Sequence, residues 1–108
     1  MTARAPKDCR DMTEVRAEID RVDNMLVDVI AERFGFVDRA WQLKTNPGDA
    51  HVPWRIQQVI DKVKARAKEK GLPPELTEAL WRQMIGWFVQ YEEEKLRRSL
   101  EGNGGKGA

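Results

Sequence analysis

The chain has 108 residues, which is enough for one domain. Its 19 Lys and Arg nearly balance its 18 Asp and Glu, so the formal net charge of +1 provides no overall field to recruit nucleic acid or an acidic membrane. The single cysteine cannot form an internal disulfide, and one cysteine with one histidine excludes a zinc site of the usual ligands.

The sequence also lacks the motifs of several kinds of chemistry. It has no Gly-rich phosphate loop and no nucleophile elbow, so we expect neither covalent nor metal-assisted catalysis, and no cofactor. No apolar run approaches the ~20 residues of a membrane span. The first residues lack the apolar stretch of a secretory signal, and we expect a cytoplasmic protein.

Composition divides the chain into three parts. Residues 1–10 are polar and include a proline, which predicts a flexible lead-in. Residues 11–98 predict a helical domain, with Asp11 or Thr13 able to cap its first helix. Residues 99–108 are rich in glycine and predict a disordered tail.

The stretch 15–44 predicts one long amphipathic helix. Apolar residues recur every three or four positions, at Val15, Ile19, Val22, Leu26, Val29, Phe36 and Ala40. The breaker cluster at residues 46–49 ends the helix near Lys44 or Thr45. Such a helix spans roughly 45–50 Å, more than the width of a compact domain of this size, so we expect a partner to cover it.

Three cations mark this helix. Arg33 continues the row of Ile19 and Leu26 and so interrupts the apolar face with a charge that needs an anionic partner. Lys44 returns to nearly the same face roughly 16 Å further along, whereas Arg16 lies roughly 25 Å from Arg33. A second, antiparallel copy of the helix would carry its own Arg16 up to Arg33 and Lys44. The alternative is that all three are surface cations whose stems cover apolar area.

Two further helices follow. Pro53 suits the first turn of the second helix, and Gly71 ends it. The third helix runs from about Glu75 to Leu96 or beyond, and its Glu92 prolongs an apolar row, where burial would favour the protonated acid. The alternative is that the helix has reached solvent at Glu92. No strand pattern appears, so the sequence predicts an all-α fold of three helices, long–short–long, closing as an intertwined homodimer.

These residues resemble a known family. The similarity covers roughly residues 8–97, and it is carried by Asp8-Cys9, Arg16-x-x-Ile19-Asp20-x-x-Asp23, Glu32-Arg33, Lys44, Arg55-Ile56 and the stretch from Trp87 to Glu92. The sequence is similar to the all-helical class of chorismate mutases and to their relatives, the isochorismate pyruvate lyases. The resemblance implies a homodimer whose long first helices pair, with two active sites that are each built from both chains.

The resemblance also implies a role for each site residue, with a small dicarboxylate as the substrate. Arg33 would bind one substrate carboxylate, and Arg16 of the other subunit would bind the second. Lys44 would bridge a carboxylate and the ether oxygen whose bond breaks, and Arg55 would add a further cation. Glu92 falls where many mutases have Gln, and it can donate a hydrogen bond to the ether oxygen only when protonated. Activity that depends on Glu92 should therefore prefer acid pH.

A second departure concerns the reaction. Chorismate mutases commonly carry acidic residues beside the arginine at the start of the second helix, to hold the ring hydroxyl, whereas Arg55 has no acidic residue among its close neighbours, Val52, Pro53, Trp54 and Ile56. Isochorismate pyruvate lyases also lack these acids and share the Asp-Cys lead-in, but those compared have Gln where this chain has Glu92. His51 and Asp49 in the preceding loop are the residues that would replace a missing partner.

Three hypotheses follow from these patterns. The first is an isomerase, a chorismate mutase that makes prephenate for Phe and Tyr synthesis in the shikimate pathway. The second is a lyase that converts isochorismate to salicylate and pyruvate, or a mutase acting on an altered chorismate. The third is a non-catalytic helical dimer. Retention of Arg16, Arg33, Lys44 and Arg55 argues against the third, because apolar residues would make a more stable interface at these points.

Overall fold

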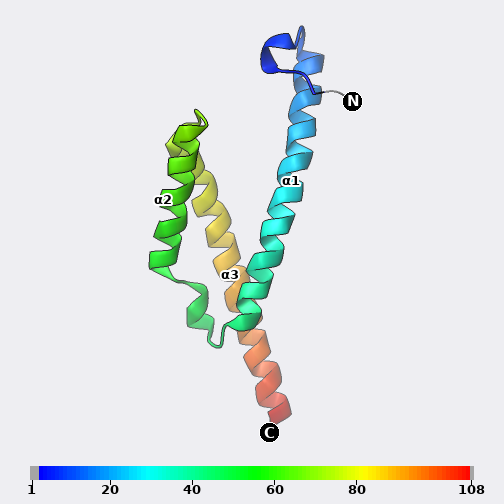
Figure 1. Ribbon diagram of the computed structural model, residues 1–108. Coiled ribbons are helices and arrows are strands. Elements are labelled where there is room, and N and C mark those ends of the chain that lie inside the picture. Colours follow the sequence, from blue (N-terminus) through cyan, green and yellow to red (C-terminus); the bar gives the residue numbers. More distant parts are fainter. Residues whose placement is uncertain (1–2, 108) are drawn as a thin grey trace. The chain divides into compact units, whose positions relative to one another are not determined.

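The computed structural model describes the backbone of residues 3–107 and the side chains of residues 3–102. Its elements are the 3-10 helix η1 (Pro6–Asp8), α1 (Met12–Leu43), the 3-10 helix η2 (Pro47–Ala50), α2 (Pro53–Glu69) and α3 (Pro74–Gly107) (Figure 1). The described backbone contains no strand, which confirms the predicted all-α fold with its long–short–long order. The chain divides into an N-terminal unit, Met1–Phe36, and a C-terminal unit, Val37–Ala108.

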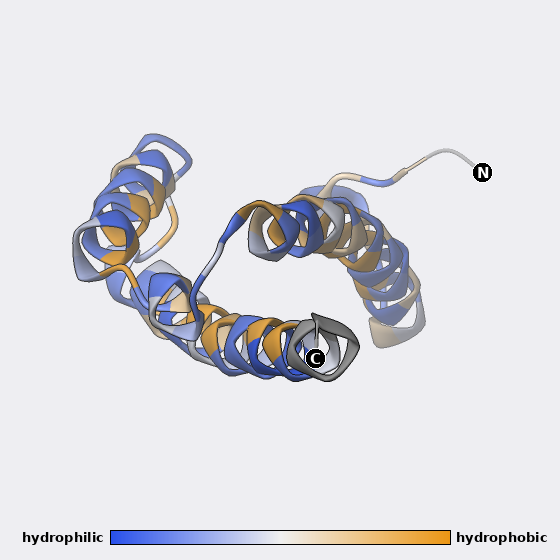
Figure 2. Cartoon of the chain, turned by 90° about the horizontal axis from the view of Figure 1, so that it is seen from below, coloured by the Kyte–Doolittle hydropathy of each residue, from blue (hydrophilic) through white to orange (hydrophobic). Residues whose placement is uncertain are grey.

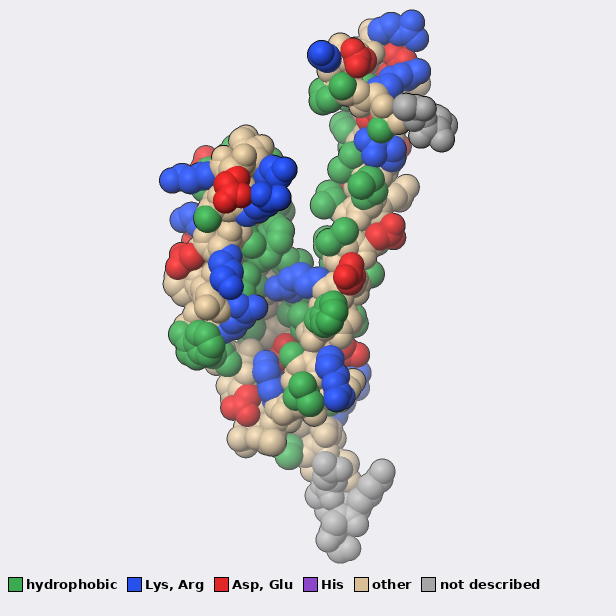
Figure 3. All heavy atoms as spheres, viewed as in Figure 1, with side chains coloured by type: hydrophobic (Ala, Val, Ile, Leu, Met, Phe, Trp, Pro, Cys, Tyr) green, Lys and Arg blue, Asp and Glu red, His purple; other side chains and the backbone are tan. Residues whose placement is uncertain are grey.

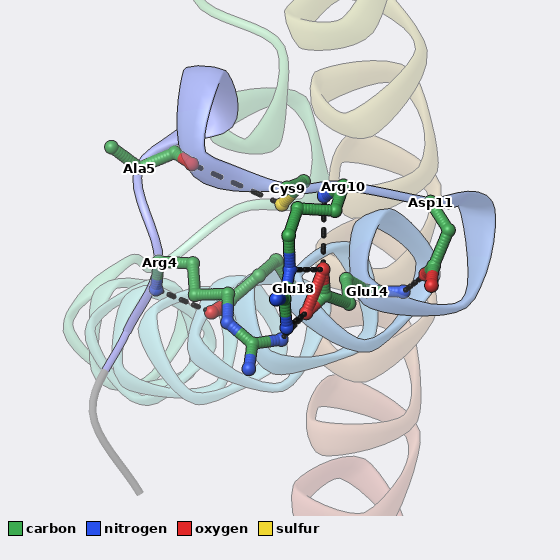
Figure 4. Close-up of polar contacts among 7 residues, drawn as sticks. All are labelled: Arg4, Ala5, Cys9, Arg10, Asp11, Glu14 and Glu18. Carbon is green, nitrogen blue, oxygen red and sulfur yellow. Dashed lines mark hydrogen bonds and ion pairs between the residues drawn. The ribbon is translucent and has the colours of Figure 1, made fainter.

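The start of α1 is fixed by side-chain caps. The backbone N–H of Glu14 donates to Asp11 Oδ1 at 2.9 Å, so Asp11, one of the two predicted caps, fills that role. Glu14 in turn accepts from the backbone N–H of Arg10 at 2.9 Å and pairs with the side chains of Arg4 and Arg10 (Figure 4). Residues 3–10 therefore carry η1 and several polar contacts; their flexibility stays a prediction.

Within the N-terminal unit, the apolar face of α1 is exposed. No side chain of α1 is fully buried, and Leu26 and Phe36 on its predicted apolar face are 53% and 72% exposed. Figure 2 shows hydrophobic positions recurring along this helix, and Figure 3 shows hydrophobic side chains at its surface. Exposed apolar surface of this extent is typical of an interaction site.

In the C-terminal unit, a structured connection leads from α1 to α2. α1 ends at Leu43, within two residues of the predicted end, and η2 follows. Asn46 and Asp49 form a capping box around η2, which holds the predicted breaker cluster in a defined turn. Pro53 occupies the first position of α2 as predicted, because its missing N–H would have no partner there.

α2 and α3 lie side by side and supply most of the small core (Figure 1). Gly71 ends α2 with a φ of 74°, a conformation that glycine adopts without strain, and Leu72 N–H donates to Ala67 O at 2.8 Å. The buried apolar residues in the described part of the chain are Ala50, Ile60, Ala67, Phe88 and Leu96.

α3 extends further than the sequence predicts. Its backbone is helical to Gly107, whereas the helical domain was expected to end at residue 98 with a disordered tail beyond it. Ala108 lies outside the described residues, and the flexibility of the tail stays a prediction. None of the helices in residues 3–107 is long and apolar enough to cross a membrane.

Candidate active site

Lys44 and Glu92 form the centre of the candidate site. Lys44 follows the last residue of α1, and its Nζ donates to Glu92 Oε2 on α3 at 2.6 Å. Glu92 is 7% exposed, and the Lys44 side chain is 27% exposed. A carboxylate buried to this extent requires a charged or hydrogen-bonding partner, and the lysine provides both.

The burial of Glu92 follows from its place in α3. Phe88 precedes it by four residues and Leu96 follows it by four, and both are buried, so the three side chains share one face of the helix. The predicted apolar row therefore continues through Glu92, and the alternative that the helix reaches solvent there is wrong. Protonation of Glu92 during function stays a prediction.

Arg55 lies in the first turn of α2, also in the C-terminal unit. Its side chain is exposed, and Nη1 donates to Gln58 Oε1 at 2.7 Å, one turn along the same helix. The guanidinium is therefore held along the surface of α2. Its hydrogen bond to the neutral amide of Gln58 is exposed, so water can replace it. The structure gives Arg55 a position beside the loop that contains His51 and Val52, as predicted from sequence.

Arg16 and Arg33 both lie on α1 in the N-terminal unit. Arg16 is exposed, and Arg33 is half-buried. Because both belong to one continuous helix, they are separated by about 25 Å along its axis. One copy of the chain therefore does not bring these two cations to a single small ligand.

A groove opens between α3 and the start of α2. It has a volume of about 450 Å³ and is lined by His51, Ile56, Arg82, Ile85, Gly86, Val89, Gln90 and Glu93. Ile56, Ile85 and Val89 give it apolar walls, and its polar groups come from His51 and α3. None of the five predicted site residues is among the residues that line this groove.

Comparison with known proteins identifies the family. Residues 15–93 match the family described as chorismate mutase type II. The chain belongs to this family. All five predicted site residues, Arg16, Arg33, Lys44, Arg55 and Glu92, lie within the matched range.

Two relatives of the chorismate mutase type II family are similar to this chain. The isochorismate pyruvate lyase of Pseudomonas aeruginosa is 28% identical over 99 residues, which cover 92% of this chain and 97% of that protein. The T-protein of Enterobacter agglomerans is 29% identical over 91 residues, which cover 83% of this chain and 24% of the T-protein. Members of this family thus have more than one activity. Identities of 28% and 29% do not determine which reaction the present chain catalyses, so the reaction has to be argued from its own residues.

Sequence reasoning missed a hydrogen-bonded cluster beside Lys44 and Glu92. Asp38 Oδ1 accepts hydrogen bonds from Trp41 Nε1 and from the Tyr91 hydroxyl, each at 2.7 Å. The bond from Tyr91, followed by that from Trp41, lowers the pKa of Asp38, and the same bond to Asp38 raises the pKa of Tyr91. The only sequence signal was the spacing of three between Asp38 and Trp41, which places them on one side of α1.

Proposed function

We propose that this chain is a chorismate mutase that acts as a homodimer. The observation that carries the proposal is the pair of Lys44 with the buried Glu92, a cation and a potential proton donor at one point of a family fold built for such reactions. A pericyclic rearrangement requires no nucleophile and no base. It requires that a flexible dianion be held in a reactive conformer and that the developing charge on its ether oxygen be stabilised.

Lys44 and Glu92 have complementary roles in this proposal. Lys44 contacts a substrate carboxylate and the ether oxygen, so its positive charge stabilises the negative charge that develops on the ether oxygen as the bond breaks. The substrate then competes with Glu92 for the lysine. Lys44 then contacts the substrate instead of Glu92, and Glu92 lies beside a dianion. Both changes favour the neutral acid, which can donate a hydrogen bond to the ether oxygen. Binding and proton uptake are thereby coupled, and the reaction is faster in acid.

The two remaining cations require the dimer. Arg33 binds one carboxylate of the substrate, and Arg16 of the partner subunit binds the other. Arg16 and Arg33 of one chain are about 25 Å apart on the same helix, so an antiparallel second copy is the simplest source of the missing cation. Arg55 adds a further positive charge from the first turn of α2 once its side chain turns from Gln58 to the substrate.

The exposure of α1 supports the dimer. Its apolar face includes Ile19, Val22, Leu26, Val29 and Phe36, all exposed in the single chain. Burial of such side chains contributes about 1.5–3 kcal/mol each when it is complete. A paired α1 would convert an unfavourable surface into the largest apolar interface of the protein. This continuous face is typical of the interfaces of obligate homodimers.

A second candidate reaction is the cleavage of isochorismate to salicylate and pyruvate. The observation that favours it is the apolar character of the residues around Arg55, since Val52 and Ile56 replace the acids that would hold the ring hydroxyl of chorismate. The groove repeats this pattern, because Ile56, Ile85 and Val89 form its walls. A similar protein named isochorismate pyruvate lyase supports the same alternative. His51, which lines the groove, is the residue that would restore a contact to the hydroxyl of chorismate.

An ultraviolet assay with product chromatography tests the proposal. Purified protein is offered chorismate and isochorismate separately at about pH 5 and pH 8. Prephenate from chorismate, formed faster in acid, is the expected result. Salicylate and pyruvate from isochorismate would replace the mutase with the lyase. No turnover of either compound would favour a non-catalytic dimer, which isothermal titration with chorismate would then examine.

A further inference from the structure

The carboxylate of Asp38 joins the last turns of α1 to α3. Trp41 Nε1, one turn further along α1, and the Tyr91 hydroxyl on α3 both donate to Asp38 Oδ1, each at 2.7 Å. The two bonds share one acceptor atom, so the position of each donor depends on the other. All three residues belong to the C-terminal unit.

This cluster adjoins the Lys44–Glu92 pair at both of its ends. Lys44 follows Trp41 by three residues, and its backbone N–H donates to the carbonyl of Trp41 at 3.2 Å. Tyr91 directly precedes Glu92 on α3. Two links therefore connect the same end of α1 to the same turn of α3, one through Asp38 and Tyr91 and one through Lys44 and Glu92.

We propose that Asp38 and Tyr91 are positioning residues that set where Lys44 lies relative to Glu92. This inference rests on the proposed function, in which Lys44 contacts the ether oxygen. Lys44 lies beyond the last residue of α1, where the helix no longer restrains the backbone on both sides. Its long side chain has many rotamers, so an anchor at Asp38 and Trp41 limits the region that Nζ can reach.

Further contacts hold the α3 side of this anchor in place. The Tyr91 ring stacks on Trp87, with centroids 5.6 Å apart and planes at 12°, and Lys95 Nζ lies 5.5 Å from the Tyr91 centroid. The hydrogen bonds lower the pKa of Asp38 and raise the pKa of Tyr91. At neutral pH the carboxylate thus stays ionised and the phenol keeps its proton, so the bond persists over the range in which activity is measured.

Steady-state kinetics distinguishes positioning from a purely structural role. Asp38→Ala removes the shared acceptor, and we expect kcat to fall by about tenfold to a hundredfold while KM changes by less than about threefold, because misplacement costs most in the transition state. Asp38→Asn keeps a carbonyl oxygen that accepts both hydrogen bonds, and it should restore most of the lost kcat. Asp61→Ala is the matched control, since Asp61 accepts one exposed hydrogen bond from Gln57 on α2.

A second measurement does not depend on activity. Competitive acetylation with N-hydroxysuccinimidyl acetate, read by mass spectrometry, compares Lys44 with the exposed Lys62. Tyr91→Phe and Asp38→Ala should raise the acetylation rate of Lys44 by about threefold or more and leave the acetylation rate of Lys62 unchanged. Without the anchor, Lys44 Nζ should separate from the Glu92 carboxylate more often and react more often. Circular dichroism verifies the fold, and Tyr91→Phe decides the question if Asp38→Ala does not fold.

The outcomes separate this inference from the proposed function. A wild-type protein that converts neither chorismate nor isochorismate refutes the function, and the labelling rates then decide whether the cluster positions Lys44. An active wild type whose Asp38→Ala and Tyr91→Phe variants keep both the wild-type kcat and the wild-type labelling of Lys44 would overturn the inference. An equal loss of kcat in Asp38→Ala and Asp38→Asn would also contradict it, because the shared acceptor would not be the cause.

Discussion

Lys44 Nζ lies 2.6 Å from Glu92 Oε2, although the two residues are 48 positions apart in the sequence. The carboxylate is almost fully buried and the lysine is largely so. Two charges removed from water in this way contribute little net stability, because their desolvation offsets most of their attraction. The pair of Lys44 with Glu92 therefore adds little to folding stability, which supports the catalytic role proposed for it.

Replacement of Glu92 by Gln tests whether a proton at this position limits the reaction. The amide of Gln donates a hydrogen bond at every pH, whereas Glu donates only when protonated. Wild-type kcat/KM should be at least about tenfold higher at pH 5 than at pH 8, because the active form is lost as pH rises. In Glu92→Gln the ratio of kcat/KM at pH 5 to kcat/KM at pH 8 should fall to about one, because kcat/KM at pH 8 should rise.

Rate measurements with chorismate between pH 5 and pH 8 provide the comparison. Glu94→Gln is the matched control, because Glu94 is a nearby acid of α3 that pairs with Arg97 and Arg98 and is not among the residues that line the groove. Its ratio should remain that of the wild type. A Glu92→Gln protein that keeps the acid preference would show that another group carries the proton.

Removal of the lysine should reveal the cost of the buried carboxylate. Lys44→Met leaves Glu92 without its cation, and we expect the free energy of unfolding at pH 8 to fall by about 1–3 kcal/mol. Adding Glu92→Leu in the same chain should recover most of this loss, because the uncompensated charge disappears. Urea titrations followed by tryptophan fluorescence measure both changes. If the two substitutions were simply additive, the pair would not be energetically coupled.

Periodicity in the sequence predicted much of this structure, and its limits have a physical cause. The three-four spacing of α1 and the row that includes Phe88 and Glu92 fixed which residues share a helix face, since this depends only on helical geometry. Pro53 marked where α2 begins and Gly71 marked where it ends, whereas the glycine-rich stretch near the C-terminus did not end α3. The contact of Lys44 with Glu92 depends on the loop through η2, and the cluster of Asp38 with Tyr91 joins two helices. No local pattern encodes such contacts.

A charge on the apolar face of α1 should prevent dimer formation. Leu26→Glu places a carboxylate on the row of Ile19 and Arg33, where a partner helix would bury it, and the protein should become a monomer without activity. Val27→Glu is the matched control, since Val27 is 64% exposed but lies about 100° further around the same helix. Sedimentation velocity at several concentrations measures the mass. A dimer in Leu26→Glu would place the interface elsewhere.

Mixing two inactive variants tests whether each active site uses both chains. Arg33→Ala and Arg16→Ala should each be folded dimers with activity reduced by at least about a hundredfold, because each lacks a cation for one substrate carboxylate. In a heterodimer, one site has lost both cations and the other retains Arg33 from one chain and Arg16 from its partner. Random exchange makes about half of the dimers heterodimers, so about a quarter of the wild-type activity should return.

The subunit-exchange experiment requires a control that shows that refolding alone does not restore the activity of either variant. The two variants are unfolded together in urea, refolded and assayed with chorismate, and each variant is treated alone in the same way. Activity should return only in the mixture, and its KM should match that of the wild type because the restored site is complete. No recovery in a mixture that contains heterodimers would mean that Arg16 and Arg33 do not serve one site across the interface. Each cation would then act within its own chain.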